Sequence, residues 1–498
     1  MNKPMQPEVR RAVLWSVLFG IVFALGAAIA VVSAWYSCTY DLEFKELLYT
    51  LASPLKGTGE STVALVIGSC LPWVLLLIAL YVGVAVFLWK KRDALRLARR
   101  IGALLCVVFL IASSVFSVYA LRVPAYLEAR RDQTAIYENE YIDPATVTIT
   151  ADGKMKNLIC IYLESMETTY ASEEVGGAQP TNYMPNLTAL AASNLSFSDK
   201  SAGLLGGYHT PLGTGWTMSA LLATTSGIPF SFPLGENGHN KMSKRENFAS
   251  GLTTLGDILA ERGYRQQFLC GSDAAFAGRD TYFEQHGNYE ICDLDTARKE
   301  HYVPEGYHDG WWGFEDSILF DVAKDKLTEL SAGPRPFNLT LLTVDLHHVG
   351  GHLCDLCENT HGNKTANVVS CTDRQVTDFV SWCQSQAFYE DTVIVVVGDH
   401  PRMDTALVGK TDYYDRTVYN CFINAVPTPQ GATTERIVTS FDLFPTTLAA
   451  MGFSIEGNRL GFGVNLFSSE PTLAERLGYD YLETEINKFS EYYIREFS

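Results

Sequence analysis

Three long apolar segments near the start of the chain most constrain what it can fold into. Residues 12–36, 63–89 and 101–121 contain no charged side chain, and each reaches the length of roughly 20 residues that a membrane-spanning α-helix needs. A cleaved signal peptide is the alternative for the first segment, but this segment is longer than a typical signal-peptide core and two more spans follow it. We therefore predict a membrane anchor over residues 1–121 with three transmembrane helices.

The charged residues that flank these segments predict their orientation. Arg10 and Arg11 precede the first segment, and residues 90–100 between the second and third hold six basic side chains against one acidic one. The loop at 37–62 holds two basic and four acidic side chains. Because cytoplasmic loops are rich in Lys and Arg, we expect a multi-pass protein of the cytoplasmic (inner) membrane whose chain beyond residue 121 is extracytoplasmic.

The remainder of the chain is strongly acidic. Residues 151–498 carry 24 Lys and Arg against 45 Asp and Glu. Such a charge argues against nucleic acid as a partner and is compatible with a soluble domain that uses cations.

Nine of the eleven cysteines fall on the predicted outer side of the membrane, where disulfides form and persist. Cys354, Cys357 and Cys371 cluster in the sequence with His352 and His361. We expect a loop held by a disulfide, without a choice of which cysteines pair. A small zinc knuckle of the pattern H-x-C-x₂-C-x₃-H is the alternative.

Beyond a polar linker at 122–150, short apolar runs alternate with stretches of helical spacing. Strands are predicted at 157–163, 267–270, 337–344, 392–397 and 418–423, and helices at 184–193, 216–225, 253–262, 314–331 and 372–386. This alternation is typical of an α/β fold. We therefore predict one domain over residues 151–498, with a mainly parallel sheet sandwiched by helices.

The run TVIVVVGDH at 392–400 predicts where the chemistry of this domain lies. A continuous Val/Ile run indicates a strand buried on both faces of a parallel sheet, and α/β folds place their sites at the carboxyl ends of such strands. Gly398 would let the backbone turn sharply. Asp399 and His400 then offer an oxygen and an imidazole to Zn²⁺ or Mn²⁺, although a strand-end turn with a solvated acid is the alternative.

Two further segments supply partners for this pair. The strand at 157–163 ends in Glu164, which would meet residues 399–400 if the two strands are neighbours; otherwise Glu164 is an acid that begins a helix. A glycine-rich turn before Thr217 opens a helix, where free N–H groups stabilise a phosphate. An ordinary N-cap is the alternative for Thr217. Together these residues suggest a one-metal site in which the metal activates the threonine hydroxyl as a nucleophile.

Six motifs follow one another along the chain: YLES (162–165), GTGWT (213–217), GRD (278–280), TVDLHH (343–348), VVVGDH (395–400) and FDLFPTTLAAMG (441–452). In this order they resemble a known family, the membrane-anchored lipoteichoic acid synthases and phosphoglycerol transferases, whose catalytic domain is of the sulfatase type within the alkaline phosphatase superfamily. The resemblance covers roughly residues 155–465. The GTGWT form and the cysteine-bearing segment after His348 look more like the phosphoglycerol transferases that modify periplasmic glucans.

The resemblance implies roles for individual residues. Thr217 would be the nucleophile, and one divalent ion, Mn²⁺ with Mg²⁺ or Zn²⁺ as alternatives, would bind Glu164, Thr217, Asp399 and His400. Arg279 would contact the glycerophosphate, because its guanidinium can donate hydrogen bonds to two phosphate oxygens at once. His347, or its neighbour His348, would serve the transferred group or the leaving oxygen. A surface arginine and a structural histidine are the alternatives.

The same GRD loop contains Asp273, a further substrate-binding candidate. In the family an aromatic residue lies two positions before the arginine, whereas here that position is Ala277 and Phe276 comes one earlier. Trp312 is expected to be structural.

The implied activity is transfer of a phosphoglycerol group from phosphatidylglycerol to a glycan or glycerophosphate acceptor through a phosphothreonine. An anchor suits a lipid donor, because tethering raises its effective concentration. A phosphoethanolamine transferase with the same metal site is one alternative, and a catalytically inactive glycan-binding or sensor domain is another. An arylsulfatase is disfavoured, because no C/S-x-P/A-x-R segment follows the first strand.

Overall fold

The computed structural model describes residues 7–40, 44, 45, 47, 48, 60–90, 95–151, 153, 155–231, 248–307, 312–409 and 411–497. Most of the loop at 37–62, and residues 91–94 of the basic loop, lie outside this set. The chain divides into two compact units, one of residues 1–47 with 60–128 and the other of residues 48–59 with 129–498.

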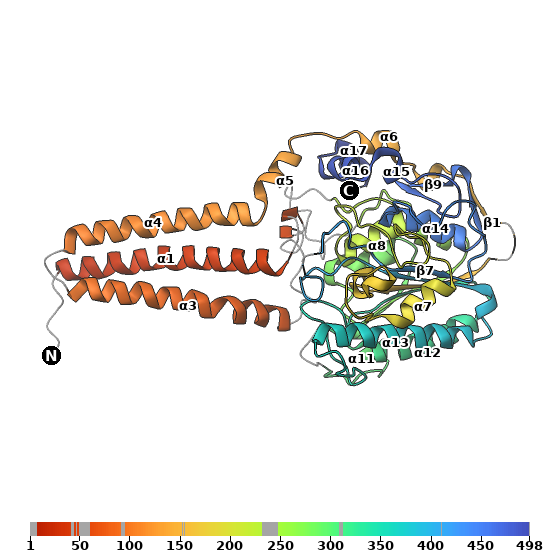
Figure 1. Ribbon diagram of the computed structural model, residues 1–498, viewed down its shortest axis with the longest axis horizontal. Helices are drawn as coiled ribbons and strands as arrows, with labels where there is room; N and C mark the ends of the chain where they lie inside the picture. The colour runs from red at the N-terminus through yellow and green to blue at the C-terminus, as the bar shows by residue number, and fades with distance from the viewer. Residues whose placement is uncertain are drawn as a thin grey trace. The chain divides into compact units, whose positions relative to one another are not determined.

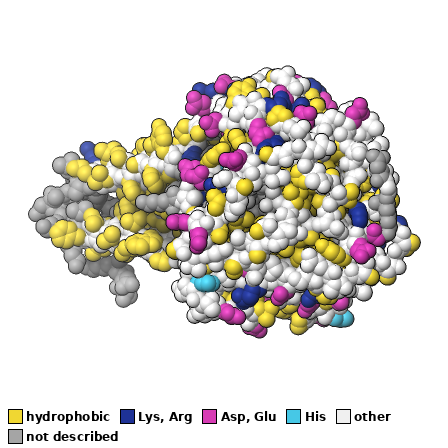
Figure 2. Space-filling model, turned by 45° about the vertical axis from the view of Figure 1, so that its right-hand side comes forward, with side chains coloured by type: hydrophobic (Ala, Val, Ile, Leu, Met, Phe, Trp, Pro, Cys, Tyr) yellow, Lys and Arg dark blue, Asp and Glu magenta, His cyan; other side chains and the backbone are white. Residues whose placement is uncertain are grey.

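The first unit contains three long helices, α1 (Pro7–Thr39), α3 (Glu60–Lys90) and α4 (Leu95–Ala120), followed by the short α5 (Val123–Ala129). Their apolar windows at 13–39, 64–87 and 100–120 have mean hydropathies of 2.6, 2.5 and 2.6. At most 17% of any window is buried within the protein, and hydrophobic side chains cover the described surface of these helices in Figure 2. By length and composition all three can cross a membrane, as predicted.

Helix α1 packs against both of the other long helices. The ring of Phe23 stacks on Tyr81 of α3 at 5.0 Å and on Phe109 of α4 at 4.7 Å between centroids. The hydroxyls of Ser33 and Ser117 lie 2.7 Å apart. Polar groups that pair across apolar helices avoid the cost of facing hydrocarbon alone, so these contacts suit a three-helix membrane anchor.

The second unit is built on a six-stranded sheet with the order β4-β3-β5-β2-β6-β7. Its strands are β2 (Asn157–Leu163), β3 (Arg265–Cys270), β4 (Glu290–Cys292), β5 (Phe337–Leu342), β6 (Thr392–Gly398) and β7 (Asn420–Ile423). All neighbouring pairs are parallel except β6 and β7. The mainly parallel α/β sheet predicted from the sequence is confirmed.

Both faces of the sheet are buried, as the Val/Ile runs predict. Successive side chains of a strand point to opposite faces, and accordingly Cys160 and Val395 join one hydrophobic core while Ile161 and Val396 join the other. Figure 1 shows α8 and α14 on one side of the sheet, and α7, α12 and α13 on the other. The strand ends therefore offer the chain a place for polar chemistry that the faces do not.

The remaining elements cover or edge this core. The helices of the second unit are α6 (Ile136–Glu140), α7 (Pro185–Ser193), α8 (Thr217–Ser226), α9 (Leu255–Glu261), α10 (Arg279–Gln285), α11 (Leu294–Lys299), α12 (Asp316–Ser331), α13 (Lys364–Gln384), α14 (Leu443–Ala450), α15 (Leu473–Leu477), α16 (Tyr479–Asn487) and α17 (Glu491–Phe497). Two small antiparallel ladders pair β1 (Ile149–Ala151) with β8 (Phe453–Ile455) and β9 (Arg459–Leu460) with β10 (Gly463–Val464). Every predicted strand and helix is present within a few residues of its predicted place, except that α13 begins eight residues earlier.

Candidate active site

The candidate residues follow the carboxyl ends of four adjacent strands. Leu163 at the end of β2 lies opposite Gly398 at the end of β6 in the register of these neighbouring strands. Glu164 and Asp399 come directly after them, so the condition set by the sequence, that the two strands be neighbours, is met. The segments after β3 and β5, which carry Arg279 and His347, leave the same edge of the sheet.

Thr217 begins α8 and faces this edge. Its Oγ1 donates a hydrogen bond to Glu164 Oε2 at 3.3 Å, and it lies 3.3 Å from His400 Nε2. In the turn before the helix, Gly213 has φ 82°, and its carbonyl accepts from the N–H of Phe230 at 2.8 Å. The glycine-rich turn and the helix after it are as predicted, and the structure brings all four proposed ligands together.

Buried carboxylates and an imidazole form the floor of the site. Glu164, Asp399 and His400 are at most 2% exposed, and one ligand atom from each lies within 4.8 Å of the others. Burial raises the pKa of Asp399 to about 7, an effect that the neighbouring His400 opposes and Glu164 reinforces. Two buried acids at such close quarters need a counter-charge, either a proton or a cation.

The hydrogen bonds of Asp399 and His400 leave atoms for a cation. His400 Nδ1 lies 2.8 Å from the carbonyl of Pro401, a contact in which Nδ1 donates and Nε2 keeps its lone pair toward Thr217. Asp399 Oδ1 accepts from the N–H groups of Ser165 and His400, at 2.8 and 2.7 Å. Asp399 Oδ2, by contrast, is buried 3.3 Å from His400 Nε2 and accepts no hydrogen bond from any residue that the structure describes.

This donor set fits a divalent metal ion. Glu164, Thr217, Asp399 and His400 supply two carboxylates, a hydroxyl and an imidazole, a mixture that suits Mn²⁺, Zn²⁺ or Mg²⁺. A cation would also satisfy the orphaned Oδ2 of Asp399.

Two residues that the sequence does not mark as site residues, Ser165 and Thr343, contact the candidate ligands. Ser165 adopts a left-handed conformation at φ 52°, from which its N–H reaches Asp399 and its hydroxyl donates to Glu164 Oε1 at 2.6 Å. Thr343, the first residue after β5, accepts from the N–H of Glu164 at 3.0 Å. The sequence offers only their position as a signal: Ser165 follows Glu164 after the predicted strand at 157–163, and Thr343 lies near the end of the predicted strand at 337–344.

Gly398 has a different role from the one expected. Its φ is not in the left-handed region, and it is the last residue of β6 rather than a turn. A Cβ added there would lie 2.1 Å from the carbonyl oxygen of Met166. The glycine is therefore required because the backbone at Met166 passes close by. The hydroxyl of Tyr208 also donates to the Gly398 carbonyl.

Arg279 is held in place by the loop that carries it. Its Nε donates to the Phe276 carbonyl at 3.2 Å, and its Nη2 donates to Ser272 Oγ and to the Asp273 carbonyl at 3.0 and 2.7 Å. Asp273 Oδ1 accepts from the N–H of Ala275, which closes the turn. The carboxylate of Asp273 thus shapes the loop, and the fixed guanidinium is buried to 3% exposure, unlike a surface arginine.

His347 lies in an aromatic stack that leads toward the same loop. Its ring is 3.9 Å from Trp312 and 4.2 Å from His348 between centroids, and Trp312 packs in turn on Phe276 at 4.7 Å. The pKa of His347 is well below the usual range because of burial, and His348, His400 and Arg279 lower it further. Trp312 therefore supports His347, as its expected structural role requires.

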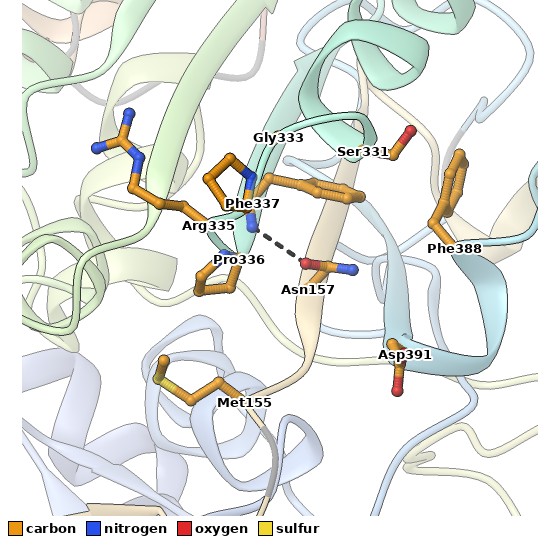
Figure 3. Close-up of a pocket in the computed structure, with 10 residues that line it drawn as sticks. Met155, Asn157, Ser331, Gly333, Arg335, Pro336, Phe337, Phe388 and Asp391 are labelled. Carbon is orange, nitrogen blue, oxygen red and sulfur yellow. Dashed lines mark hydrogen bonds between the residues drawn. The ribbon is translucent and has the colours of Figure 1, made fainter.

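The opposite edge of the sheet has a hollow of its own. A pocket of about 360 Å³ lies where β2, β5 and β6 begin, with Asn157 accepting from the N–H of Phe337 at 3.1 Å (Figure 3). Phe388 and Asp391 line its far side. None of the candidate site residues lines this pocket, so it is separate from the carboxyl edge.

Comparison with known proteins places this geometry in a family. The chain is 28% identical over 359 residues to phosphoglycerol transferase I of Xanthomonas axonopodis pv. citri (strain 306), which covers 70% of this chain and 48% of the relative. It is 29% identical over 434 residues to phosphoglycerol transferase I of Escherichia coli O127:H6, with 85% of this chain and 53% of the relative covered. The chain thus spans about half the length of the curated relatives it matches.

Among solved structures, the lipoteichoic acid synthase LtaP from Listeria monocytogenes aligns with a TM-score of 0.49 and 17% identity, over 65% of this chain and 79% of that one. The model of the family described as sulfatase matches residues 156–453. This match covers more than half of the chain and includes every strand of the main sheet, so the chain belongs to the sulfatase family.

Proposed function

We propose that this protein transfers a phosphoglycerol group from phosphatidylglycerol to an extracytoplasmic glycan or glycerophosphate acceptor through a phosphothreonine on Thr217. The observation that carries the proposal is the position of Thr217 Oγ1, 3.3 Å from both Glu164 Oε2 and His400 Nε2 at the start of a helix. A hydroxyl in this place is oriented for attack, and its proton already points at a carboxylate. The similarity to phosphoglycerol transferases supports the choice of group.

In the first half of the reaction, Thr217 Oγ1 gives up its proton through Glu164 Oε2, its hydrogen-bond acceptor, and forms a bond to phosphorus. The bond to the diacylglycerol oxygen breaks, and that oxygen takes up one proton from solvent, so that diacylglycerol leaves as an alcohol. A divalent ion, Mn²⁺ in our proposal, bound by Glu164, Thr217, Asp399 and His400 would lower the pKa of the hydroxyl and offset phosphoryl charge. Arg279 holds a phosphate oxygen with its preset guanidinium. The N-terminus of α8 adds further stabilisation of negative charge.

In the second half, an acceptor hydroxyl attacks the same phosphorus and the bond to Thr217 breaks, which restores the threonine. His347 Nδ1 lies 2.9 Å from the carbonyl of His348, a contact that keeps its proton on Nδ1 and leaves Nε2 basic. Burial lowers the pKa of His347, so its imidazole is neutral, can accept the hydrogen of the attacking hydroxyl at Nε2 and readily gives the proton up again. Thr217 Oγ1 regains a proton as its bond to phosphorus breaks.

The proposed chain organisation suits this reaction. Residues 1–121 form the membrane anchor, 122–150 the linker and 151–498 the catalytic domain, which the positive-inside rule places outside the cytoplasmic membrane. A lipid donor diffuses in the same bilayer, so the anchor keeps enzyme and donor together.

Substitution of the nucleophile tests the proposal. The full-length protein is purified in detergent and incubated with Mn²⁺ and headgroup-labelled phosphatidylglycerol or phosphatidylethanolamine. We expect diacylglycerol release from phosphatidylglycerol and label on Thr217, both lost in Thr217→Ala. Thr328→Ala is the matched control, because this threonine is exposed on α12 and bonds its own helix.

The possible results separate the candidate functions. Normal turnover by Thr217→Ala would show that Thr217 is not the nucleophile. Label from phosphatidylethanolamine alone would identify a phosphoethanolamine transferase. Absence of label from both lipids, with the metal bound, would point to an inactive binding domain. Chelation of divalent ions should abolish turnover, and added Mn²⁺ should restore it.

A further inference from the structure

Three cysteine sulfurs meet in a cluster that the proposed reaction does not use. Cys354 and Cys357 come from the loop after β5, and Cys371 comes from α13. The Sγ atom of Cys354 lies 3.7 Å from that of Cys357 and 3.7 Å from that of Cys371, and all three sulfurs lie within 4.8 Å of one another. Cys354 and Cys371 are buried and Cys357 is half-buried.

The separations of these sulfurs distinguish the two expectations from the sequence. A disulfide holds its sulfurs about 2.05 Å apart, and all three residues are free thiols in this structure. Tetrahedral zinc binds thiolates at about 2.3 Å, which sets neighbouring sulfurs about 3.8 Å apart. The two separations of 3.7 Å match the metal and not the disulfide.

The local backbone has the form of a zinc knuckle. The N–H of Cys357 donates to the Cys354 carbonyl at 3.0 Å, so the C-x₂-C segment closes into a tight turn with both sulfurs on one side. A C-x₂-C turn facing a helix is a common arrangement of structural zinc ligands. The histidines of the H-x-C-x₂-C-x₃-H pattern are not in the cluster, and His361 instead lies 2.9 Å from the hydroxyl of Ser370.

Gln375 completes the surroundings of the sulfurs. It lies one helical turn after Cys371, and its Nε2 donates to the sulfur of Cys371 at 3.3 Å and to that of Cys354 at 3.8 Å. Such donors stabilise thiolates that bind a metal.

We propose that Cys354, Cys357 and Cys371 bind one Zn²⁺ ion, with solvent as the fourth ligand on the half-buried side of Cys357. Thiolates are soft ligands that select such an ion. Binding releases the three thiol protons and transfers no electron. The site is distinct from the proposed catalytic metal site, whose ligands are oxygen and imidazole.

The ion would join the loop after β5 to α13. In this loop the N–H of His352 donates to the Asp345 carbonyl at 2.6 Å, and the N–H of Gly351 donates to the His347 carbonyl at 3.2 Å. The knuckle is thus only a few hydrogen bonds from His347. A bound Zn²⁺ would fix the position of this histidine without touching the substrate.

Cobalt replacement tests the site separately from catalysis. The full-length protein is loaded with Co²⁺, and near-ultraviolet absorption is recorded, because thiolates give a charge-transfer band that oxygen and imidazole ligands do not. We expect the band in the wild type, its loss in Cys371→Ser and in the milder Cys357→Ser, and its weakening in Gln375→Leu. Cys383→Ser, a buried cysteine of the same helix outside the cluster, should retain it.

Counting the free thiols among Cys354, Cys357 and Cys371 is the measurement that can overturn the proposed zinc site. Cells are quenched with N-ethylmaleimide in denaturant, and peptides are mapped by mass spectrometry. Three alkylated cysteines together with the cobalt band support the site. A disulfide between any two of them, or three free thiols without the band, would overturn it, and neither result bears on the role of Thr217.

Discussion

Replacement of Gly398 by alanine is the sharpest test of how the fold positions the candidate metal site. The added Cβ would lie 2.1 Å from the Met166 carbonyl oxygen and 2.5 Å from Cγ1 of Val418. Real Cβ atoms essentially never come closer than 3.0 Å to such atoms, so strand and backbone must separate by at least 0.9 Å. Neither neighbour yields easily, because β6 is buried on both faces.

The shift acts directly on the ligands. Asp399 and His400 follow the substituted residue, and Asp399 Oδ1 is tied to the N–H of Ser165. A displacement of about 1 Å in a catalytic group costs roughly 100-fold in rate, while overpacking of a core costs about 1–3 kcal/mol. We therefore expect Gly398→Ala to remain folded, to melt a few degrees lower and to lose about 100-fold in release of diacylglycerol.

The assay compares turnover and thermal unfolding of Gly398→Ala with those of Gly306→Ala. A Cβ at Gly306 meets open space at an exposed turn, so this control should behave as the wild type. Wild-type turnover in Gly398→Ala would refute the argument that close backbone approach sets the site. A protein that is unfolded in detergent would refute the estimate of its energetic cost.

Two other predictions concern the substrate loop and the core. Arg279→Lys keeps the charge but loses the planar guanidinium that Ser272 and the Asp273 carbonyl hold in place. The KM for phosphatidylglycerol should therefore rise about tenfold or more. An unchanged KM would show that Arg279 does not bind the substrate. Burial raises the pKa of Asp442 from 3.8 to about 7, so the folded protein binds more protons than the unfolded chain between these values. Stability should therefore fall as pH rises from about 4 to about 7, and urea unfolding of Asp442→Asn should lack this component; parallel pH profiles would contradict it.

The sequence predicts the sheet and the position of two carboxylates, Glu164 and Asp399, from the burial of the strands. The Val/Ile run of β6 can satisfy its burial only inside a sheet, and a polar residue at the end of such a strand has only the edge to occupy. This argument predicts Glu164 and Asp399 at the carboxyl edge of the sheet, where the structure has them. That β2 and β6 are neighbours, which the metal site requires, is a property of the strand order that local patterns do not contain.

Other features depend on contacts between distant segments. Gly398 is needed because of Met166, more than 200 positions away, so its place before Asp399 suggested a turn instead. β4 spans only Glu290–Cys292, too short for any periodicity. The predicted extracytoplasmic position of Cys354, Cys357 and Cys371 favours a disulfide. The distances between their sulfurs, however, depend on how α13 packs against the loop after β5, which local sequence does not contain.

The difference between buried elements and loops also separates the proposed chemistry of the site from its choice of lipid headgroup. The proposed metal ligands come from the ends of β2 and β6 and the start of α8, which are buried elements with little freedom to vary. Arg279 and His347 come from loops after β3 and β5, one shaped by left-handed Ala277 and Gly278 and the other leading to the cysteine cluster. The proposed nucleophile and metal ligands are therefore predictable from strand-end and helix-start motifs, while we expect discrimination between glycerol and ethanolamine headgroups to arise in the loops. It follows that exchanges within these two loops, with Thr217 and its neighbours unchanged, should alter the headgroup preference and leave the phosphothreonine chemistry intact.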